Sequence, residues 1–123
     1  MNEKNKKINL SQKLKKINDY WSPKVVSELN DYQFKLVKVK DDFVWHHHSK
    51  SDETFIVIKG KLFIDFKNKT EEINEGEIIT VAKGINHKPF AKKEAHVLIV
   101  EPRGVKNTGN LNTDLTAQND VWI

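Results

Sequence analysis

A helical pattern of apolar residues occurs only near the amino terminus of the chain. The residues at positions i, i+4, i+7 and i+11 of this pattern are Leu10, Leu14, Ile17 and Trp21. Such spacing predicts a short amphipathic helix with one apolar stripe. Asn9 is a favoured N-cap residue, Gln12 three positions later would complete a capping box, and Pro23 ends the pattern. We therefore expect a short helix that packs across a larger unit.

From residue 24 to residue 103 the pattern changes to short apolar segments rich in Val, Ile and Phe, separated by turn-forming Gly, Asn and Asp. The segments cover Lys24–Leu29, Gln33–Lys40, Phe43–His48, Glu53–Ile58, Lys61–Phe66, Thr70–Ile73, Glu77–Val81 and Ala95–Glu101. Many short strands at even spacing, without helices between them, predict an all-β antiparallel sandwich or barrel. Two similar groups of strands, each ending in a histidine-bearing segment, favour a double Greek key.

Several expected strands are apolar on both faces. In the segment Glu53–Ile58, Phe55 and Val57 point to one face, while Ile56 and Ile58 point to the other. One face can line the interior of a barrel, but the other face must also be covered. The amino-terminal helix is too short to cover all of it. We therefore expect a homodimer in which a second copy of the chain covers the rest.

The composition excludes several classes of protein. The 123 residues contain no cysteine, which excludes a disulfide framework and a thiolate metal site. No apolar run approaches the roughly 20 residues of a membrane helix. The lysines near the amino terminus are not followed by the apolar stretch of a secretory signal. These observations lead us to expect a cytoplasmic protein with no membrane partner.

The charge balance also argues against a nucleic-acid partner. The net charge is +4, and Arg103 is the only arginine among the 21 basic residues. Bidentate recognition of phosphate or guanine uses arginine, so the excess of lysine is interpreted as a solvated surface. Arg103 could bind an anionic group, although a carboxylate partner in the same chain or across a dimer interface is the preferred interpretation.

Three consecutive histidines and a following glutamate carry the strongest chemical signal. On an extended strand, His46 and His48 face the same side with their Cα atoms about 6.7 Å apart, a spacing at which two imidazoles can chelate one metal ion. Glu53 begins the next strand beside them, and His87 could complete the group. Three neutral imidazoles and one carboxylate leave one or two coordination positions open, which is typical of a catalytic or sensing site.

The other two histidines have different expected roles. His47 faces away from its two neighbours, so it is expected to be packed or exposed on the outer face. His96 is a candidate catalytic base, or a partner of the metal ligands, if His96, Leu98 and Val100 form the inward face of the last strand. The alternative is an ordinary, partly exposed strand histidine.

The first group of histidines resembles the first motif of the cupin family, G-x5-H-x-H-x3-4-E-x6-G. The chain supplies His46, His48, Glu53 and Gly60 at the required spacing. Lys40 stands in place of the leading glycine, in a turn that does not contact the ligands. Spacing that matches over this many positions is hard to obtain by chance.

The second cupin motif, G-x5-P-x-G-x2-H-x3-N, is similar to the segment that begins at Gly76. Gly84 and His87 match, while Ala82 replaces the proline and Ala91 replaces the asparagine. The resemblance covers about residues 36–103. It implies a double-stranded β-helix, or jelly-roll barrel, with a short amino-terminal helix. It also implies a divalent metal ion (Fe, Mn, Zn or Ni) held by His46, His48, Glu53 and His87.

Over its whole length the chain is similar to small single-domain cupins described as phosphomannose-isomerase-like, a label that reflects kinship of domains. The segments that carry this similarity are Trp21–Lys24, Trp45–His48 and Glu101–Gly109. The resemblance implies a metal-binding protein that acts on, or binds, a small oxygen-rich molecule. Three alternatives remain open: a non-haem metal dioxygenase, a sugar isomerase-like enzyme, and a non-catalytic small-molecule binding module.

Three parts are expected along the chain. An amino-terminal arm and helix cover residues 1–22, a cupin β-barrel covers residues 23–103, and a carboxy-terminal docking tail covers residues 104–123. The tail ends in Val121, Trp122 and Ile123, whose apolar surface is costly to leave in water. We expect these residues to dock on their own barrel or on the partner's barrel.

Overall fold

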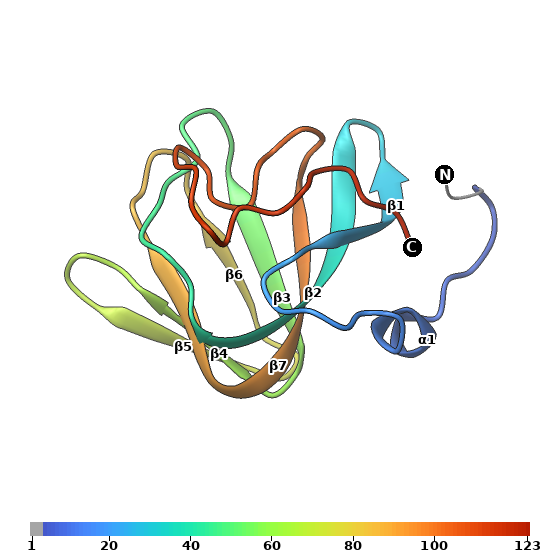
Figure 1. Cartoon of the computed structure of the whole chain (residues 1–123), viewed down its shortest axis with the longest axis horizontal. Helices are drawn as coiled ribbons and strands as arrows, with labels where there is room; N and C mark the ends of the chain where they lie inside the picture. Colours follow the sequence, from blue (N-terminus) through green and yellow to red (C-terminus); the bar gives the residue numbers. More distant parts are fainter. Residues whose placement is uncertain (1–3) are drawn as a thin grey trace.

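Residues 4–123, which the computed structural model describes, form seven strands and one helix (Figure 1). The first three residues of the predicted amino-terminal arm lie outside this part. In chain order the elements are α1 (Leu10–Leu14), β1 (Lys24–Leu29), β2 (Tyr32–Asp42), β3 (Glu53–Lys59), β4 (Lys61–Asp65), β5 (Thr70–Asn74), β6 (Ile78–Val81) and β7 (Lys88–Pro102). None of the described helices is long and apolar enough to cross a bilayer.

The strand β7 connects the parts of the sheet. Its first residues pair with β4, as at Phe90 and Phe63, and its second half pairs with β2 on one side and β3 on the other. The main strand order is β1-β2-β7-β3-β6, and β5 continues the sheet beyond β4. Because one strand takes part in both groups, the antiparallel sheet curls into a barrel. The predicted all-β jelly-roll fold is confirmed.

Most predicted strands coincide with observed strands to within about two residues, but two segments differ. Phe43–His48 is not a strand, because its backbone makes only one isolated bridge, between His46 and His87. The last strand begins at Lys88 rather than at Ala95. Its early part contains exposed charged residues at the rim of the barrel, so the apolar pattern did not reveal it.

The helix α1 is shorter than its apolar stripe predicted. Asn9 caps it as expected, because its side chain accepts a hydrogen bond from the backbone N–H of Gln12 at 3.0 Å. Leu14 and the following Ile17 pack against Leu36 on the outside of the barrel. The helix therefore covers part of the outer face of the sheet, as the pattern indicated.

Trp21 leaves this stripe and enters the barrel interior. Its φ of +60° lies in the left-handed region, which redirects the chain after the helix. The backbone N–H donates to the Lys38 carbonyl at 2.9 Å, and Nε1 donates to the Lys40 carbonyl at 2.8 Å. The indole stacks on Phe43 with 4.7 Å between ring centroids. The assignment of Trp21 to the helical stripe is therefore wrong, because the turn breaks the helical spacing.

The inward face of β7 is the opposite of the predicted one. Val97, Ile99 and Glu101 are buried toward the barrel interior, whereas His96 and Leu98 alternate with them on the outer face. The sequence is apolar in both phases of this strand, so the period of two could not decide which phase faces inward. The expectation that His96, Leu98 and Val100 point inward is corrected.

The outer face is only partly covered. One row of paired residues crosses the sheet in the order Ile78, Ile56, Leu98 and Leu36. At one end, Leu36 is fully buried beneath α1 and its following residues. At the other end, Ile78 is 63% exposed. The apolar row is therefore covered by the helix at Leu36 and uncovered at Ile78 on the edge strand β6.

The carboxy-terminal tail crosses one end of the barrel and finishes beside β1 (Figure 1). The backbone of Val25 donates to the Val121 carbonyl at 2.7 Å and accepts from the Ile123 N–H at 3.2 Å. Trp122 forms a parallel bridge with the same residue. The end of the tail thus docks on its own barrel, one of the two expected arrangements.

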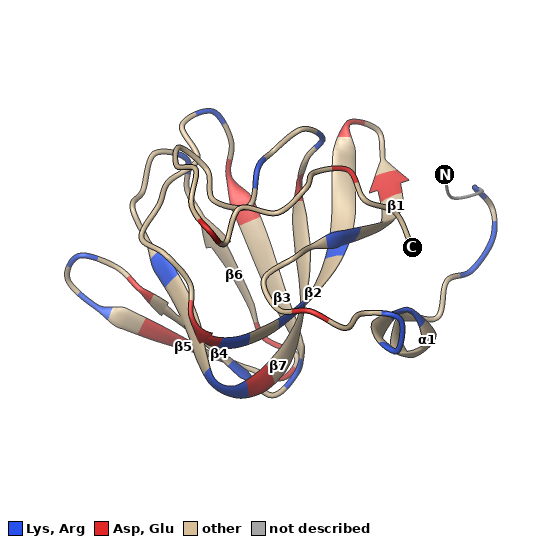
Figure 2. Ribbon diagram, in the orientation of Figure 1, with Lys and Arg blue, Asp and Glu red and all other residues tan. Residues whose placement is uncertain are grey.

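Charged residues of both signs are interspersed along the barrel strands, whereas the charged residues of the described arm before α1 are all lysines (Figure 2). Arg103 is held within the chain by Glu28, to which its Nε and Nη2 donate at 2.9 and 3.1 Å. This contact, together with a hydrogen bond from Gln33, lowers the pKa of Glu28 to about 2. The preferred interpretation of Arg103 as the partner of a carboxylate is therefore confirmed.

Candidate metal centre

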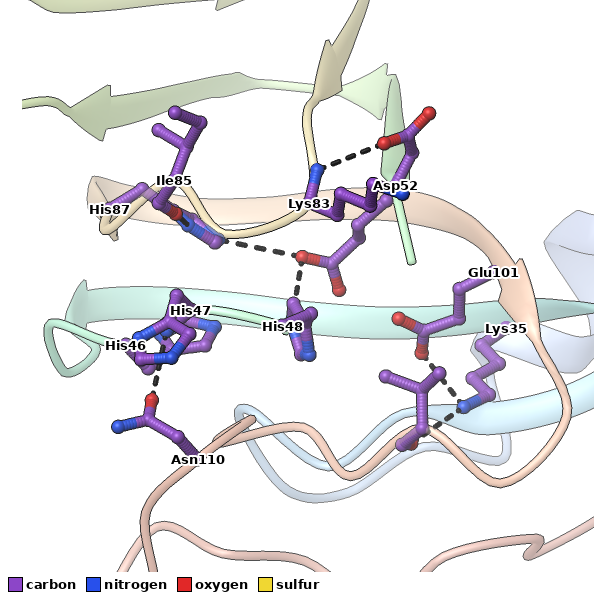
Figure 3. A network of polar contacts seen from close by, with 12 residues as sticks. Lys35, His46, His47, His48, Asp52, Lys83, Ile85, His87, Glu101 and Asn110 are labelled. Carbon is purple, nitrogen blue, oxygen red and sulfur yellow. Dashed lines mark hydrogen bonds and ion pairs between the residues drawn. The ribbon is translucent and has the colours of Figure 1, made fainter. Parts of the chain in front are cut away.

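The four predicted metal ligands converge on one point inside the barrel. The ligand atoms of His46, His48, Glu53 and His87 all lie within 4.8 Å of one another, and all four residues are buried. In Figure 3, dashed lines join His48 and His87 to the carboxylate that lies between them. Residues separated by up to 41 positions in the sequence are thus brought together by folding.

Backbone pairing between the segment that carries His46 and the segment that carries His87 explains this convergence. His46 and His87 form an antiparallel bridge, in which each N–H donates to the other's carbonyl at 3.0 and 2.9 Å. Their rings consequently lie side by side, with centroids 4.4 Å apart. Glu53 is the first residue of β3 and pairs with Val81 of β6, the strand that leads toward His87. The short connections 49–52, before Glu53, and 82–86, before His87, therefore bring the four residues to one end of the barrel.

Hydrogen bonds to the backbone orient two of the imidazoles. Nδ1 of His46 lies 2.8 Å from the Val44 carbonyl, and Nδ1 of His87 lies 2.9 Å from the Ile85 carbonyl. A carbonyl oxygen can only accept, so Nδ1 must carry the proton in both rings. The Nε2 atoms are then unprotonated in the neutral rings and point their lone pairs into the cluster. This arrangement is typical of metal-binding histidines.

Several polar atoms in the cluster lack hydrogen-bond partners. They are Nε2 of His48, Nε2 of His87 and Oε1 of Glu53, and all are buried. The carboxylate oxygen lies 3.2 Å from the first nitrogen and 3.5 Å from the second. Leaving a buried polar atom unsatisfied costs about 1–3 kcal/mol. A divalent cation between these atoms would satisfy all of them, so the residues fit a metal ion.

The protonation states also suit a cation. Burial lowers the pKa of His46 to about 4, so this imidazole is neutral near pH 7. Burial acts to raise the pKa of Glu53, but the adjacent His48 and His87 outweigh it and hold that pKa well below its usual range. Metal ligands must be deprotonated before they bind. The group therefore offers an ionised carboxylate and neutral imidazole nitrogen.

A narrow apolar cavity adjoins the cluster. It is lined by His46 and Glu53 together with apolar side chains such as Val39, Phe55 and Trp21. The volume of the cavity that is open to the centre of a water molecule is about 30 Å³. By the ~10–15 Å³ that one water needs on this measure, two or three waters fit. A small molecule bound here would lie in a largely apolar environment beside the metal ligands.

The cavity wall contains a buried ion pair that sequence reasoning missed. Nζ of Lys35 lies 2.8 Å from Oε2 of Glu101, and both side chains are almost completely buried (Figure 3). Burial and the nearby Glu53 raise the pKa of Glu101. One signal was available, because Gln33 and Lys35 continue the same strand phase as the inward Val37 and Val39. Polar residues at the inward positions of a strand indicate that they are paired with another group or have a functional role.

The remaining predicted histidines lie outside the cluster. His96 is on the outer face, where Nε2 lies 2.8 Å from Glu94, a carboxylate that also accepts from the Tyr20 hydroxyl. Its predicted position as a base facing the metal is therefore corrected: the buried polar residue of β7 is Glu101, five positions later. His47 is half-buried and alternates away from the ligands, as expected.

The carboxy-terminal tail contacts the backbone of the ligand segment. The N–H of His47 donates to Oδ1 of Asn110 at 3.0 Å, and the Asn110 N–H donates back to the His47 carbonyl at 3.1 Å. A Cβ built on Gly109 would overlap that carbonyl oxygen and lie 3.2 Å from Cδ2 of His46. The tail therefore packs directly against the segment that carries two of the ligands.

Residues 34–102 match the cupin domain family. The chain is also similar to an uncharacterized protein, YdbB, of Bacillus subtilis (strain 168), with 41% identity over 64 residues. This match covers 51% of the chain and 57% of that relative, so the chain spans little more than half the length of the curated protein it matches.

Two solved structures are similar over more of the chain. A cupin-2 domain containing protein from Shewanella frigidimarina NCIMB 400 has 49% identity and a TM-score of 0.77, covering 78% of this chain and 94% of that one. Protein NMB1881 from Neisseria meningitidis has 33% identity and a TM-score of 0.73, covering 79% and 99% of the two chains. Together with the buried His3Glu group and the jelly-roll barrel, these matches show that the chain belongs to the cupin domain family.

Proposed function

We propose that this protein holds one divalent metal ion on His46, His48, Glu53 and His87, and that it binds or acts on a small oxygen-rich molecule there. The observation that carries the proposal is the set of buried, unpartnered donor atoms that face one another beside an apolar cavity. Without a cation, these atoms would be a net cost to the folded state. Two members of the group, His46 and Glu53, line this cavity, where a ligand can approach.

Each part of the site has a role in this proposal. The imidazole Nε2 atoms and the Glu53 carboxylate hold the ion, and the backbone carbonyls of Val44 and Ile85 keep two of the rings in position. Phe55 and its apolar neighbours limit the access of water to the bound molecule. When bound, the metal would supply Lewis acidity toward an oxygen atom of that molecule.

Among the enzymatic alternatives, the metal-dependent oxygenase has the most support. The ligand set is imidazole and carboxylate with no soft thiolate, which suits non-haem iron(II). The adjoining cavity is almost entirely apolar. A sugar isomerase-like reaction needs a base near the substrate carbon, and His96, the candidate for this role, lies outside the barrel. A non-catalytic binding module needs no such base and is the second candidate.

Metal analysis tests the proposal directly. Protein purified without chelators and without nickel resin is expected to contain about one divalent metal ion per chain. The metal-free protein should regain the same content after incubation with Fe(II), Mn(II), Zn(II) or Ni(II), and its melting temperature should rise. Elemental analysis and thermal melting measure the two effects. A chain that takes up none of these ions would contradict the proposal.

Three assays separate the candidate activities. Oxygen consumption by the iron-loaded protein with a catechol, thiol or diketone would support the oxygenase. Anaerobic carbonyl migration in a sugar would support the isomerase. A saturable rise in melting temperature without product would support the binding module.

We also propose that the chain forms a homodimer through the uncovered part of the outer sheet face. Ile78 at the end of the apolar row is 63% exposed, and Ile56 beside it is half-buried. Replacing Ile78 with glutamate places a charge in this surface and is expected to shift the population toward monomers, as measured by sedimentation velocity. Ile85→Glu is the matched control, because Ile85 is also exposed but lies outside this row. An unchanged sedimentation coefficient for Ile78→Glu would contradict this interface.

A further inference from the structure

Glu101 lies on the inward face of β7 and reaches the cavity beside the metal centre. Its Oε2 atom accepts a hydrogen bond from Nζ of Lys35 at 2.8 Å. The same ammonium group also donates to the carbonyl of Val105 at 3.3 Å. The side chain of Lys35 thus fixes one oxygen of the carboxylate, and the carboxylate is held in place by a neighbouring strand and by the tail.

Fold stability does not account for this pair. Two charged side chains are buried, with Glu101 lining the cavity, and apolar residues of similar size at such positions are often equally or more stable. The second carboxylate oxygen, Oε1 of Glu101, is buried and has no hydrogen-bond partner. Burying a carboxyl group without pairing both of its oxygens costs free energy of folding. A carboxyl group that lines a cavity with one oxygen unpaired therefore indicates a contact with a ligand.

The other polar groups around the cavity are already used. The amide nitrogen of Asn107 donates to the carbonyls of Trp21 and Leu115, and its amide oxygen accepts from the Ala117 N–H. His46 and Glu53 belong to the proposed metal centre. Among the described residues that line the cavity, Glu101 is therefore the polar residue outside the proposed ligand group that has an unpartnered oxygen, and its carboxyl group lies beside that of Glu53.

We propose that Glu101, positioned by Lys35, is a specificity-determining residue that receives a hydroxyl group of the bound molecule. This inference rests on the proposed metal-dependent function and narrows its ligand class. The ligand would be a small molecule with oxygen atoms for the metal and at least one further hydroxyl for Glu101. A hydroxyl fits because it both donates and accepts, so it can pair with a carboxyl group in either protonation state. The narrow cavity favours a small ligand.

Two probe molecules test this assignment on the full chain loaded with Zn(II). Lactate and glycerate share the same α-hydroxycarboxylate chelating group, but glycerate has one more hydroxyl. The wild-type protein is expected to bind glycerate about tenfold more tightly than lactate, from one hydrogen bond to a charged group. Isothermal titration calorimetry measures both affinities, and elemental analysis measures the metal content of the same samples.

The double variant Lys35→Met, Glu101→Met removes both charges together, which avoids leaving one buried and unpaired. It is expected to retain its metal and its melting temperature but to lose the preference for glycerate. Glu94→Gln is the control, because Glu94 lies on the outer face with His96 and should leave the preference unchanged.

The possible outcomes separate this inference from the function on which it rests. Metal-loaded wild-type protein that binds both probes equally would overturn the role of Glu101 while leaving the metal centre intact. A double variant that keeps the preference would do the same. Protein that takes up no metal would overturn the proposed function and this assignment with it. The comparison of probes on the wild-type chain decides the question even if the double variant does not fold.

Discussion

Replacing His48 with alanine is expected to lower the bound metal at least about tenfold, since even the outer partners of metal ligands contribute 10- to 100-fold to affinity. His48 supplies an unpartnered Nε2 atom 3.2 Å from the Glu53 carboxylate. Its removal leaves two imidazoles and one carboxylate for the ion. Elemental analysis after dialysis measures the metal content, and far-ultraviolet circular dichroism checks that the β-barrel remains folded.

The matched control for this variant is His96→Ala. Like His48, His96 lies next to a glutamate carboxylate, but it is on the outside of the barrel. It should therefore keep the metal content of the wild-type protein. If the two variants lose metal equally, or if His48→Ala retains it fully, the metal centre is not where we place it.

Replacing Gly109 with alanine is expected to lower the free energy of unfolding by about 2–5 kcal/mol, from left-handed backbone strain and from overlap. Its φ is +58°, and the added Cβ would overlap the carbonyl oxygen of His47. Either the tail or the ligand segment must then move. Because that segment carries His46 and His48, weaker metal binding is also expected. Urea unfolding and metal titration measure the two effects.

Gly76→Ala separates backbone strain from this contact. Gly76 also has a positive φ, +80°, but a Cβ there would meet no atom within 4 Å. It should lose only about 1–2 kcal/mol of stability, with unchanged metal affinity. Equal losses of stability and of metal affinity in the two glycine variants would show that the contact between the tail and His47 has no special role.

Local sequence patterns were sufficient for much of the barrel. Strand boundaries followed the alternation of apolar and polar residues, and the turns followed Gly, Asn and Asp, because both are properties of neighbouring residues. The four residues that could hold a metal ion could be predicted as well. His46, His48 and Glu53 are close in sequence, and the spacing around His87 matches a second known motif, so all four residues could be named before the fold brought His87 to the other three.

The orientation of two-sided strands could not be predicted in this way. In β7, residues 98 and 100 on one face are apolar, and residues 97 and 99 on the other face are apolar as well. Either face could therefore have pointed inward. A period of two identifies the two faces but not which of them points inward. The placement of α1 over Leu36 and Leu98 on one face decided it.

The sequence by itself determined the type of fold and the four residues that could hold a metal ion, together with the two short segments that supply them. Only the tertiary structure decided that Trp21 turns into the cavity, that Lys35 and Glu101 form a buried pair, and that Gly109 packs on the ligand segment. The physical reason is the range of the interactions. Alternation and motif spacing are local, whereas a buried pair between residues 66 positions apart depends on how the sheet closes.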